Sequence, residues 1–269
     1  MNILFIGDVC GKLGRKVLER NLSSLKKKYD IDFTIINGEN ITNGKGMNKK
    51  HYLFLKDIGA DCITLGNHYN NKEEIYDYID DSSIIVRPIN IKDETHGVGT
   101  QLFDINGISI RVSNVLGQAF MNMKQEILDP YLEILKVIEN DESDIHIIDF
   151  HAEATGEKKA FAYALKNTVT AVIGTHTHTQ TNDAQILSTD IAFISDVGMC
   201  GSYNSVLGTE IDSVVNRIIK HDDKARFKLL EKDDMILNGC VIKIDDLNFK
   251  AKEIFPIKII ERMDEDEKD

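Results

Sequence analysis

The sequence of 269 residues lacks the marks of a membrane or exported protein. No segment approaches the roughly 18 consecutive apolar residues that a helix needs to cross a bilayer. The N-terminus has no basic segment, and its apolar run extends only from Ile3 to Ile6, which is too short for the apolar core of a signal peptide. We therefore expect a cytoplasmic protein with no membrane partner.

Cysteine is also scarce, and its spacing argues against two kinds of small stabilised fold. Cys10, Cys62, Cys200 and Cys240 are far apart and form no C-x-x-C pair. A disulfide framework and a zinc knuckle both require cysteines at closer and more regular intervals. The pattern is typical of free thiols in a reducing compartment.

Basic residues are too few to balance the acidic ones. Lys and Arg number 32 against 44 Asp and Glu, so the formal net charge is −12. Duplex nucleic acid, which proteins bind through Lys and Arg, is therefore not an expected partner. A phosphate compound can still bind if metal ions supply positive charge locally. Six of the last nine residues are acidic, so we expect a single domain over residues 1–262 and a frayed acidic tail over 263–269.

Apolar runs of strand length alternate with helical stretches in the first third of the chain. This β-loop-α alternation predicts a mostly parallel sheet covered by helices. The predicted strands span 2–6, 32–36 and 62–65, and the predicted helices span about 14–29, 48–58 and 73–79.

The remaining two thirds mix hairpin and helical signals. Asn106-Gly107 between two alternating apolar segments predicts a β-hairpin. No internal repeat, low-complexity tract or linker interrupts the chain, so we expect one α/β domain with a mixed sheet. Further strands are predicted at 145–149, 169–173, 192–195, 240–244 and 254–260, and helices near 130–138 and 210–219.

Five short polar clusters each follow a strand-like apolar run. Because ligands of open α/β sheets bind beyond the carboxyl ends of the strands, these clusters are expected to converge on one crevice. The clusters are Gly7-Asp8, Gly38-Glu39-Asn40, Gly66-Asn67-His68, His151-Ala152-Glu153 and Gly174-Thr175-His176-Thr177-His178.

Carboxylate oxygens, amide oxygens and imidazoles in these clusters are the ligands of divalent iron, manganese or zinc. Taken singly, each residue has a simpler interpretation: Asp8 could cap a helix, Asn40 and Asn67 could be turn residues, and His151 could be a hydrogen-bonded, partly buried side chain. Five such clusters at five strand ends are hard to explain as caps and turns, so together they predict a metal site.

Two neighbouring residues are interpreted differently. Cys10 follows Asp8 closely but is expected to be a small buried hydrophobic residue. Glu153 either orients a ligating imidazole or is a surface carboxylate. The histidines outside the clusters are taken as ordinary; they are His51, His96, His146 and His221.

At these residues the chain resembles the calcineurin-like metallophosphoesterases and, within them, the YmdB-like bacterial phosphodiesterases. The matching stretches run in the order of the family from Gly7 to Gly201, about three quarters of the chain. The resemblance implies a double-sheet α/β/β/α sandwich, with two sheets face to face and helices outside. The stretches are GDVCGKLGR, NGENITNGKG, GNHYNNKEEI, DFHAEATGEK, GTHTHTQTND and DVGMCG.

The resemblance also implies two metal ions per chain, iron and/or manganese, and a role for each site residue. Glu39 would bridge the two ions, and His68 would act as the general acid that protonates the leaving oxygen. One ion would take Asp8, Glu39, Asn40 and His178, and the other would take Glu39, Asn67, His151 and His176.

Three departures from the pattern leave the implied ligands intact but affect their surroundings. Cys10 stands where the wider superfamily usually has a histidine. The run Tyr69-Asn70-Asn71-Lys72 stands where the YmdB-like branch usually has Trp-Asp-Lys, and the stretch after RPIN reads IKDETHGVG.

The activity implied by the resemblance is hydrolysis of cyclic nucleotides, in particular 2′,3′-cyclic nucleotides, by a hydroxide that bridges the metals. The expected partner is a small phosphodiester, and a homo-oligomer is expected. Two alternatives stay open: a phosphomonoesterase or nucleotidase using the same centre, and a nucleotide-binding regulatory protein in which hydrolysis is secondary.

Overall fold

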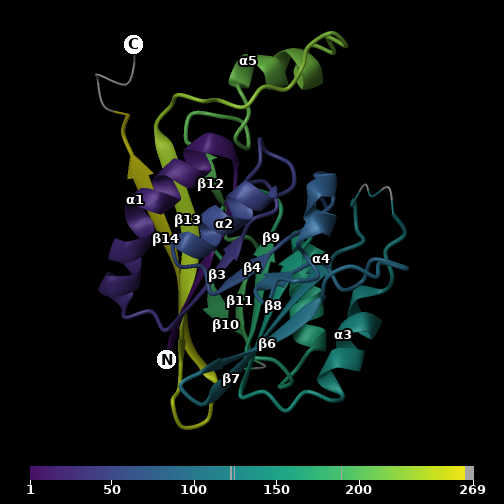
Figure 1. The fold of residues 1–269 in the computed structure, drawn as a ribbon, viewed down its shortest axis with the longest axis vertical. Coiled ribbons are helices and arrows are strands. Elements are labelled where there is room, and N and C mark those ends of the chain that lie inside the picture. The colour runs from purple at the N-terminus through teal and green to yellow at the C-terminus, as the bar shows by residue number, and fades with distance from the viewer. Residues whose placement is uncertain (122, 124, 189, 264–269) are drawn as a thin grey trace.

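The computed structural model describes residues 1–121, 123, 125–188 and 190–263. Two β-sheets lie face to face, and helices cover the outer face of each sheet (Figure 1). This arrangement confirms the predicted α/β/β/α sandwich. Of the predicted acidic tail, only Met263 belongs to the described residues, and its N–H donates to Asp234 Oδ1 over 2.8 Å; residues 264–269 lie outside them.

The larger sheet contains the first three predicted strands. They run parallel, as the β-loop-α alternation predicts, and β13 pairs antiparallel with β1, which makes the sheet mixed. Its strands are, in spatial order, β2 (Asp8–Val9), β12 (Met199–Ser202), β13 (Met235–Ile244), β1 (Asn2–Ile6), β3 (Phe33–Asn37), β4 (Cys62–Thr64) and β5 (Ile85–Val86), with β14 (Ala251–Glu261) paired to β13.

The smaller sheet has a parallel centre flanked by two antiparallel edge strands. Asn106 and Gly107 both have positive φ values, 55° and 85°, which is the conformation a two-residue hairpin turn requires. The predicted hairpin is therefore confirmed. The strand order is β10 (Gln185–Ile186), β11 (Ala192–Ile194), β9 (Ala171–Thr175), β8 (Ile145–His151), β7 (Ile108–Leu116) and β6 (Thr100–Ile105).

Four helices cover the sheets. α1 (Gly11–Tyr29) and α2 (Lys49–Asp57) pack on the larger sheet, and α3 (Pro130–Ile138) and α4 (Thr155–Ala164) pack on the smaller one. None of the helices within the described residues is long and apolar enough to span a bilayer.

The helix boundaries follow the sequence where a capping signal is present. The Asp129 carboxylate accepts the backbone N–H groups of the first turn of α3, and Pro130 opens the helix, so α3 has the predicted bounds. Cys10 precedes α1 without a side-chain cap, and α1 begins three residues before its predicted start.

Two predicted helices take other forms. Residues 73–79 contain a short 3₁₀ helix (Glu73–Asp77), and residues 210–219 contain α5 (Ile211–Val214) followed by a π-helix (Val215–Ile219). The second of these belongs to a segment that projects beyond the sheets at the top of Figure 1.

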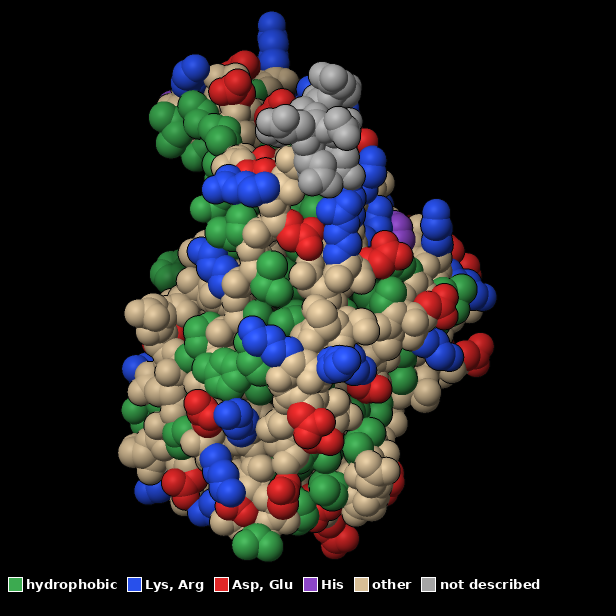
Figure 2. Space-filling view, turned by 90° about the vertical axis from the view of Figure 1, so that its left-hand side faces the viewer, with side chains coloured by type: hydrophobic (Ala, Val, Ile, Leu, Met, Phe, Trp, Pro, Cys, Tyr) green, Lys and Arg blue, Asp and Glu red, His purple; other side chains and the backbone are tan. Residues whose placement is uncertain are grey.

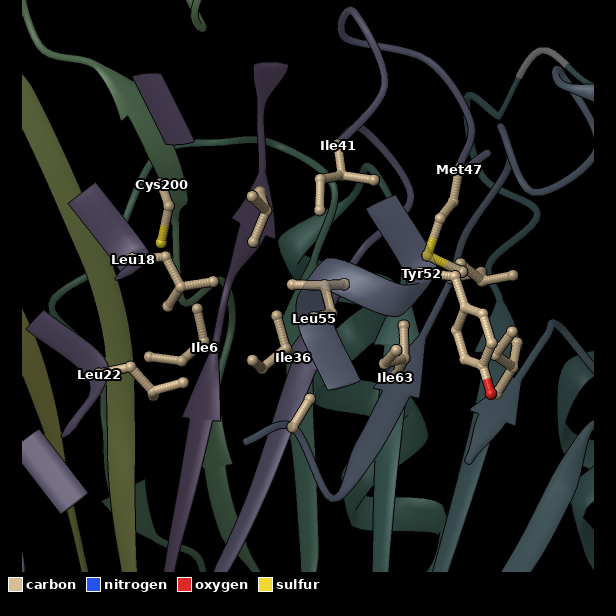
Figure 3. Close-up of a cluster of buried hydrophobic side chains, with 14 of the residues drawn as sticks. Ile6, Leu18, Leu22, Ile36, Ile41, Met47, Tyr52, Leu55, Ile63 and Cys200 are labelled. Atoms are coloured by element: carbon tan, nitrogen blue, oxygen red, sulfur yellow. The ribbon is translucent and has the colours of Figure 1, made fainter. Parts of the chain in front are cut away.

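Alternation along β1 divides the apolar core into two layers. Leu4 and Ile6 belong to a cluster with α1 and α2, whereas Ile3 and Phe5 belong to a cluster between the two sheets. Figure 3 shows Leu22 of α1 beside Ile6 in the first of these layers. Because β1 is buried on both faces, the loop that follows it starts from a fixed position.

Candidate metal centre

The five polar clusters come together at the carboxyl ends of β1, β3, β4, β8 and β9. The first three strands belong to the larger sheet and the last two to the smaller one. The two sheets therefore contribute side chains to one buried site, as the strand-end pattern predicts.

One half of the site surrounds His151, which is fully buried. Its Nε2 lies 2.9 Å from Asn67 Oδ1, 3.1 Å from His176 Nδ1 and 3.2 Å from Glu39 Oε1. Glu39, His151 and His176 each offer a ligand atom, all within 4.8 Å of one another. This grouping is large enough to hold one metal ion.

The other half of the site surrounds His178. Its Nε2 lies 2.9 Å from the side-chain amide of Asn40 and 3.9 Å from Asp8 Oδ1. The Asn40 amide also donates to Glu39 Oε1 over 3.0 Å, so Glu39 lies between the two halves. The structure thus brings together all seven residues that were expected as ligands, while their role as ligands stays a proposal.

Hydrogen bonds on the far side of His151 determine which of its nitrogens faces the site. Its Nδ1 lies 2.8 Å from Thr175 Oγ1, and that hydroxyl donates to Asp149 Oδ1 over 2.6 Å. Since the single hydroxyl proton is used on Asp149, Thr175 accepts the Nδ1–H of His151. In the neutral form of the ring, which is the form that binds a metal, the lone pair of Nε2 therefore faces the site.

The other two imidazoles are oriented in the same sense. His178 Nδ1 lies 3.1 Å from the carbonyl oxygen of Leu207, which can only accept, so Nδ1 carries the proton and Nε2 presents its lone pair to the site. His176 Nε2 lies 3.2 Å from Glu153 Oε2, so in the neutral ring Nε2 carries the proton and Nδ1 presents its lone pair to the site. An imidazole that binds a metal typically donates its other N–H to a carboxylate or carbonyl in this way.

Several buried acceptor atoms of the site lack a partner that carries positive charge or a proton. Asp8 Oδ1 and Asn40 Oδ1 are buried and have no hydrogen-bond partner among the described residues. Three acceptor atoms, Asn67 Oδ1, His176 Nδ1 and Glu39 Oε1, lie within 3.2 Å of His151 Nε2, and a single imidazole proton cannot satisfy them all. Carboxylate, amide and imidazole atoms left in this state fit divalent cations.

The pKa shifts of the site residues also indicate that the site favours a cation. Burial raises the pKa of Asp8 to about 7. Burial alone would also raise the pKa of Glu39, but His151 and His68 reverse the effect and hold it well below its usual range. Burial alone would lower the pKa of His151, but Glu39 and Asp8 raise it to about 9. The carboxylates therefore favour a cation among them.

His68 lies at the edge of this centre. Its backbone N–H donates to Glu39 Oε2 over 3.0 Å, and its Nδ1 lies 3.2 Å from Asn71 Nδ2. The half-buried side chain lines two cavities: one of about 290 Å³ that also touches Glu39, Asn40, His176 and His178, and one of about 610 Å³ on its other side. The imidazole is thus placed beside the centre.

The structure agrees with the interpretations given for Cys10 and Glu153. Cys10 is buried against Met199 and Ile236, and burial raises the pKa of its thiol to about 12, so it is the small hydrophobic residue that was expected. Glu153 is half-exposed and contacts His176, which favours the orienting interpretation.

Three of the histidines outside the clusters have partners away from this centre: Thr42 for His51, Asp80 for His96, and Ser113 for His146.

Four residues to which the sequence motifs assigned no role surround the centre: Asp149, Thr175, Lys158 and Asp196. Asp149 precedes His151 by two positions on β8, so both side chains leave the strand on one side, and this period of two was a usable signal. Lys158 has no such signal, since a lysine on a helix is usually solvated.

Glycine is needed at position 66 because the backbone passes close to two side chains of the site. A Cβ at this position would lie 2.3 Å from Glu39 Oε2 and 2.5 Å from His151 Nε2. Both contacts are far below van der Waals distance, so only glycine allows the loop after β4 to pass this close to the two side chains.

Comparison with known proteins places this geometry in context. A family model described as YmdB-like protein matches residues 4–257. The chain is 42% identical over 261 residues to a 2′,3′-cyclic-nucleotide 2′-phosphodiesterase of Bacillus subtilis, covering 96% of this chain and 97% of the relative.

Solved structures agree with the sequence comparison. A crystal structure described as a novel phosphatase, from Mycoplasma pneumoniae, superposes with a TM-score of 0.92 at 35% identity, covering 97% of this chain and 94% of the other. A Thermus thermophilus protein superposes with a TM-score of 0.89 at 31% identity, covering 97% of this chain and 100% of the other. The calcineurin-like phosphoesterase YfkN of Bacillus subtilis, at 12% identity and a TM-score of 0.56 over 97% of this chain and 90% of the other, shares the fold.

Proposed function

This chain belongs to the YmdB-like family and is a phosphoester hydrolase, and from that premise we propose that it hydrolyses cyclic nucleotides, in particular 2′,3′-cyclic nucleotides. The observation that supports this substrate most strongly is the 42% identity, over 96% of the chain, to a relative named for that reaction. The buried site at the strand ends gives the reaction a location.

The proposal assigns two metal ions to the centre. Asp8, Glu39, Asn40 and His178 would hold one ion, and Glu39, Asn67, His151 and His176 the other. When bound, such a pair supplies positive charge to the phosphoryl oxygens and makes water acidic enough to act as a nucleophile near neutral pH. Iron and manganese are both suited to these ligands.

Charge balance makes the centre attractive to phosphate. Only two of the seven proposed ligands, Asp8 and Glu39, are carboxylates, and the remaining five are neutral amides and imidazoles. Two divalent cations bring at least four positive charges, so the occupied site has a net positive charge despite the acidic protein around it. This charge would draw the phosphate of a nucleotide into the smaller cavity.

His68 is the proposed proton donor to the leaving oxygen. Its side chain lies beside the proposed ligands, and its Nδ1 faces the Asn71 amide nitrogen, so its Nε2 is the nitrogen that carries the proton in the neutral ring. A group in this role must reach the oxygen that leaves phosphorus, and the leaving group is therefore expected on the His68 side of the centre.

The larger cavity lies on that side. It has a volume of about 610 Å³ and is lined by polar side chains and one methionine, Met123. This volume falls within the range of roughly 300–1,000 Å³ typical of pockets for small organic ligands. A nucleoside fits such a space, which favours a nucleotide diester over the ester of a small alcohol.

Metal-dependent turnover tests the proposal directly. Protein stripped of metal and refilled with Mn²⁺ or Fe²⁺ is expected to hydrolyse 2′,3′-cyclic AMP and to leave a phosphate monoester largely intact. Preferential turnover of the monoester would favour a phosphomonoesterase instead. Absence of turnover on both, with two metals bound, would favour a regulatory nucleotide-binding protein.

We also propose a homo-oligomer in the cytoplasm. Apolar side chains gather on the segment that projects at the top of the molecule (Figure 2), where Ile218 is 54%, Ile219 69% and Phe227 60% exposed. Exposed apolar groups of this kind favour association. The four cysteines are free and buried, which is compatible with a reducing compartment.

A further inference from the structure

Two of the proposed ligands have an unusual backbone conformation. His176 has a φ of 103° and His178 a φ of 62°. Residues other than glycine rarely adopt positive φ values, and they do so where surrounding contacts hold the backbone in place. Contacts with the rest of the protein must therefore hold the backbone from Thr175 to His178 in this conformation.

The Asp196 carboxylate provides the first set of these contacts. Its carboxylate is fully buried, and its Oδ2 accepts the backbone N–H of Thr177 over 2.9 Å. Its Oδ1 accepts the backbone N–H of Gly198 over 2.8 Å. Thr177 lies between the two histidines, so this bond connects their backbone to the loop after β11.

The Lys158 ammonium, on α4, provides the second set of contacts. Its side chain is fully buried, and its ammonium donates to Asp196 Oδ2 over 2.9 Å and to the carbonyl oxygen of Thr175 over 2.8 Å. The pair thus binds the backbone on both sides of His176. Neither charged group belongs to the proposed ligands.

The energetics of the pair favour a positioning role. Burying two charges has a desolvation cost that their attraction often does not exceed, and well-packed apolar residues in the same place are frequently as stable. A fully buried ion pair is therefore better explained by the backbone geometry that it imposes than by a contribution to stability. It also accounts for residues that the ligand set leaves unexplained: Lys158 ends the stretch DFHAEATGEK, and Asp196 opens DVGMCG.

We propose that Lys158 and Asp196 are positioning residues that hold the backbone of His176 and His178 in the conformation needed for metal binding. The inference rests on the proposed metal centre. Lys158 and Asp196 do not touch the substrate in this account; they act through the backbone of the residues between the two imidazoles.

The test measures Mn²⁺ binding to metal-stripped protein by calorimetry, together with the melting temperature of the same metal-free protein. The variants are Lys158→Met and the double substitution Lys158→Met/Asp196→Asn. The matched control is Arg111→Met, which breaks a 2.8 Å ion pair between Arg111 of β7 and Asp141, away from the centre.

Partners that orient metal ligands typically contribute about 10–100-fold to metal affinity. We expect a loss of that order in both Lys158 variants and wild-type Mn²⁺ affinity in Arg111→Met, even where the melting temperatures fall equally. Addition of excess Mn²⁺ should restore turnover in the Lys158 variants, because the ligands themselves are intact.

Wild-type Mn²⁺ affinity in either Lys158 variant would overturn the positioning role. If Lys158→Met alone does not fold, the double variant decides, since it leaves no buried charge unpaired. A wild-type protein that binds no Mn²⁺ would overturn the metal centre as well, so failure of the centre and failure of the positioning role are distinguishable.

Discussion

Removal of the His68 imidazole tests the proposed division between metal ligands and proton donor. The side chain is half-buried, and its nearest side-chain partner, Asn71 at 3.2 Å, is exposed. The His68→Ala substitution therefore leaves no buried polar group unpaired. The backbone N–H that donates to Glu39 is also retained. We expect little change in stability and full metal content.

The expected kinetic effect follows from proton donation. General acid catalysis contributes about 10²–10⁴-fold, which corresponds to about 2.7–5.4 kcal/mol of transition-state stabilisation. The leaving oxygen of a cyclic nucleotide is a ribose alkoxide, which requires protonation. The loss of kcat on 2′,3′-cyclic AMP should therefore lie in this range.

A substrate with a good leaving group provides the internal control. The p-nitrophenolate released from bis-p-nitrophenyl phosphate is stable without a proton, so His68→Ala should lose far less activity on it. The assay compares kcat of wild type and variant on the two substrates and measures bound metal in both proteins. Asn71→Ala, which keeps the imidazole but removes its Nδ1 partner, should show a weaker form of the same trend.

Two results would refute this reasoning. Equal losses on both substrates would mean that His68 acts on a step other than protonation of the leaving group. Loss of bound metal from His68→Ala would place His68 among the ligands.

Three further substitutions test other parts of the account. Glu39→Ala should lose metal and activity together, because Glu39 lies between both halves of the site; full metal occupancy measured by elemental analysis would refute its bridging role. Gly66→Ala should weaken Mn²⁺ binding measured by calorimetry, because its methyl group would lie 2.3 Å from Glu39 Oε2; unchanged affinity would contradict the packing argument. Burial, with Arg15 and Lys50 nearby, lowers the pKa of His51 from 6.5 to about 4. The folded state thus disfavours the protonated ring, so this contribution to stability is present above pH 6.5 and is lost as the pH falls through about 4. A His51→Leu variant should show a shallower fall of the unfolding free energy over this interval, and an identical slope would rule out His51 as its source.

Local features of the sequence were enough to predict individual elements of the fold, whereas the two-sheet layering followed from the family resemblance. The apolar run of β1 predicted a strand, and Asn106-Gly107 predicted a turn whose φ values the structure bears out. The Asp129-Pro130 pair, which caps α3, coincides with the predicted start of that helix. These signals work because a strand, a turn or a cap depends on residues that are neighbours in the chain.

The grouping of the candidate site was also predictable, for a reason that extends over the whole fold. The carboxyl ends of parallel strands meet at one edge, so the polar residue after each strand is brought near the others whatever the length of chain between them. Asp8 and His178 are 170 positions apart in the sequence and 3.9 Å apart in space. Sequence motifs could therefore name the members of the site.

The sequence by itself determined most of the elements and which side chains gather at the strand ends. Only the tertiary structure decided how those side chains are oriented. The Thr175 hydroxyl that turns His151 Nε2 into the site comes from a neighbouring strand, and the Lys158–Asp196 pair joins a helix to a loop. No local pattern distinguishes a buried lysine from a solvated one, because its burial depends on contacts between elements that are distant in the chain.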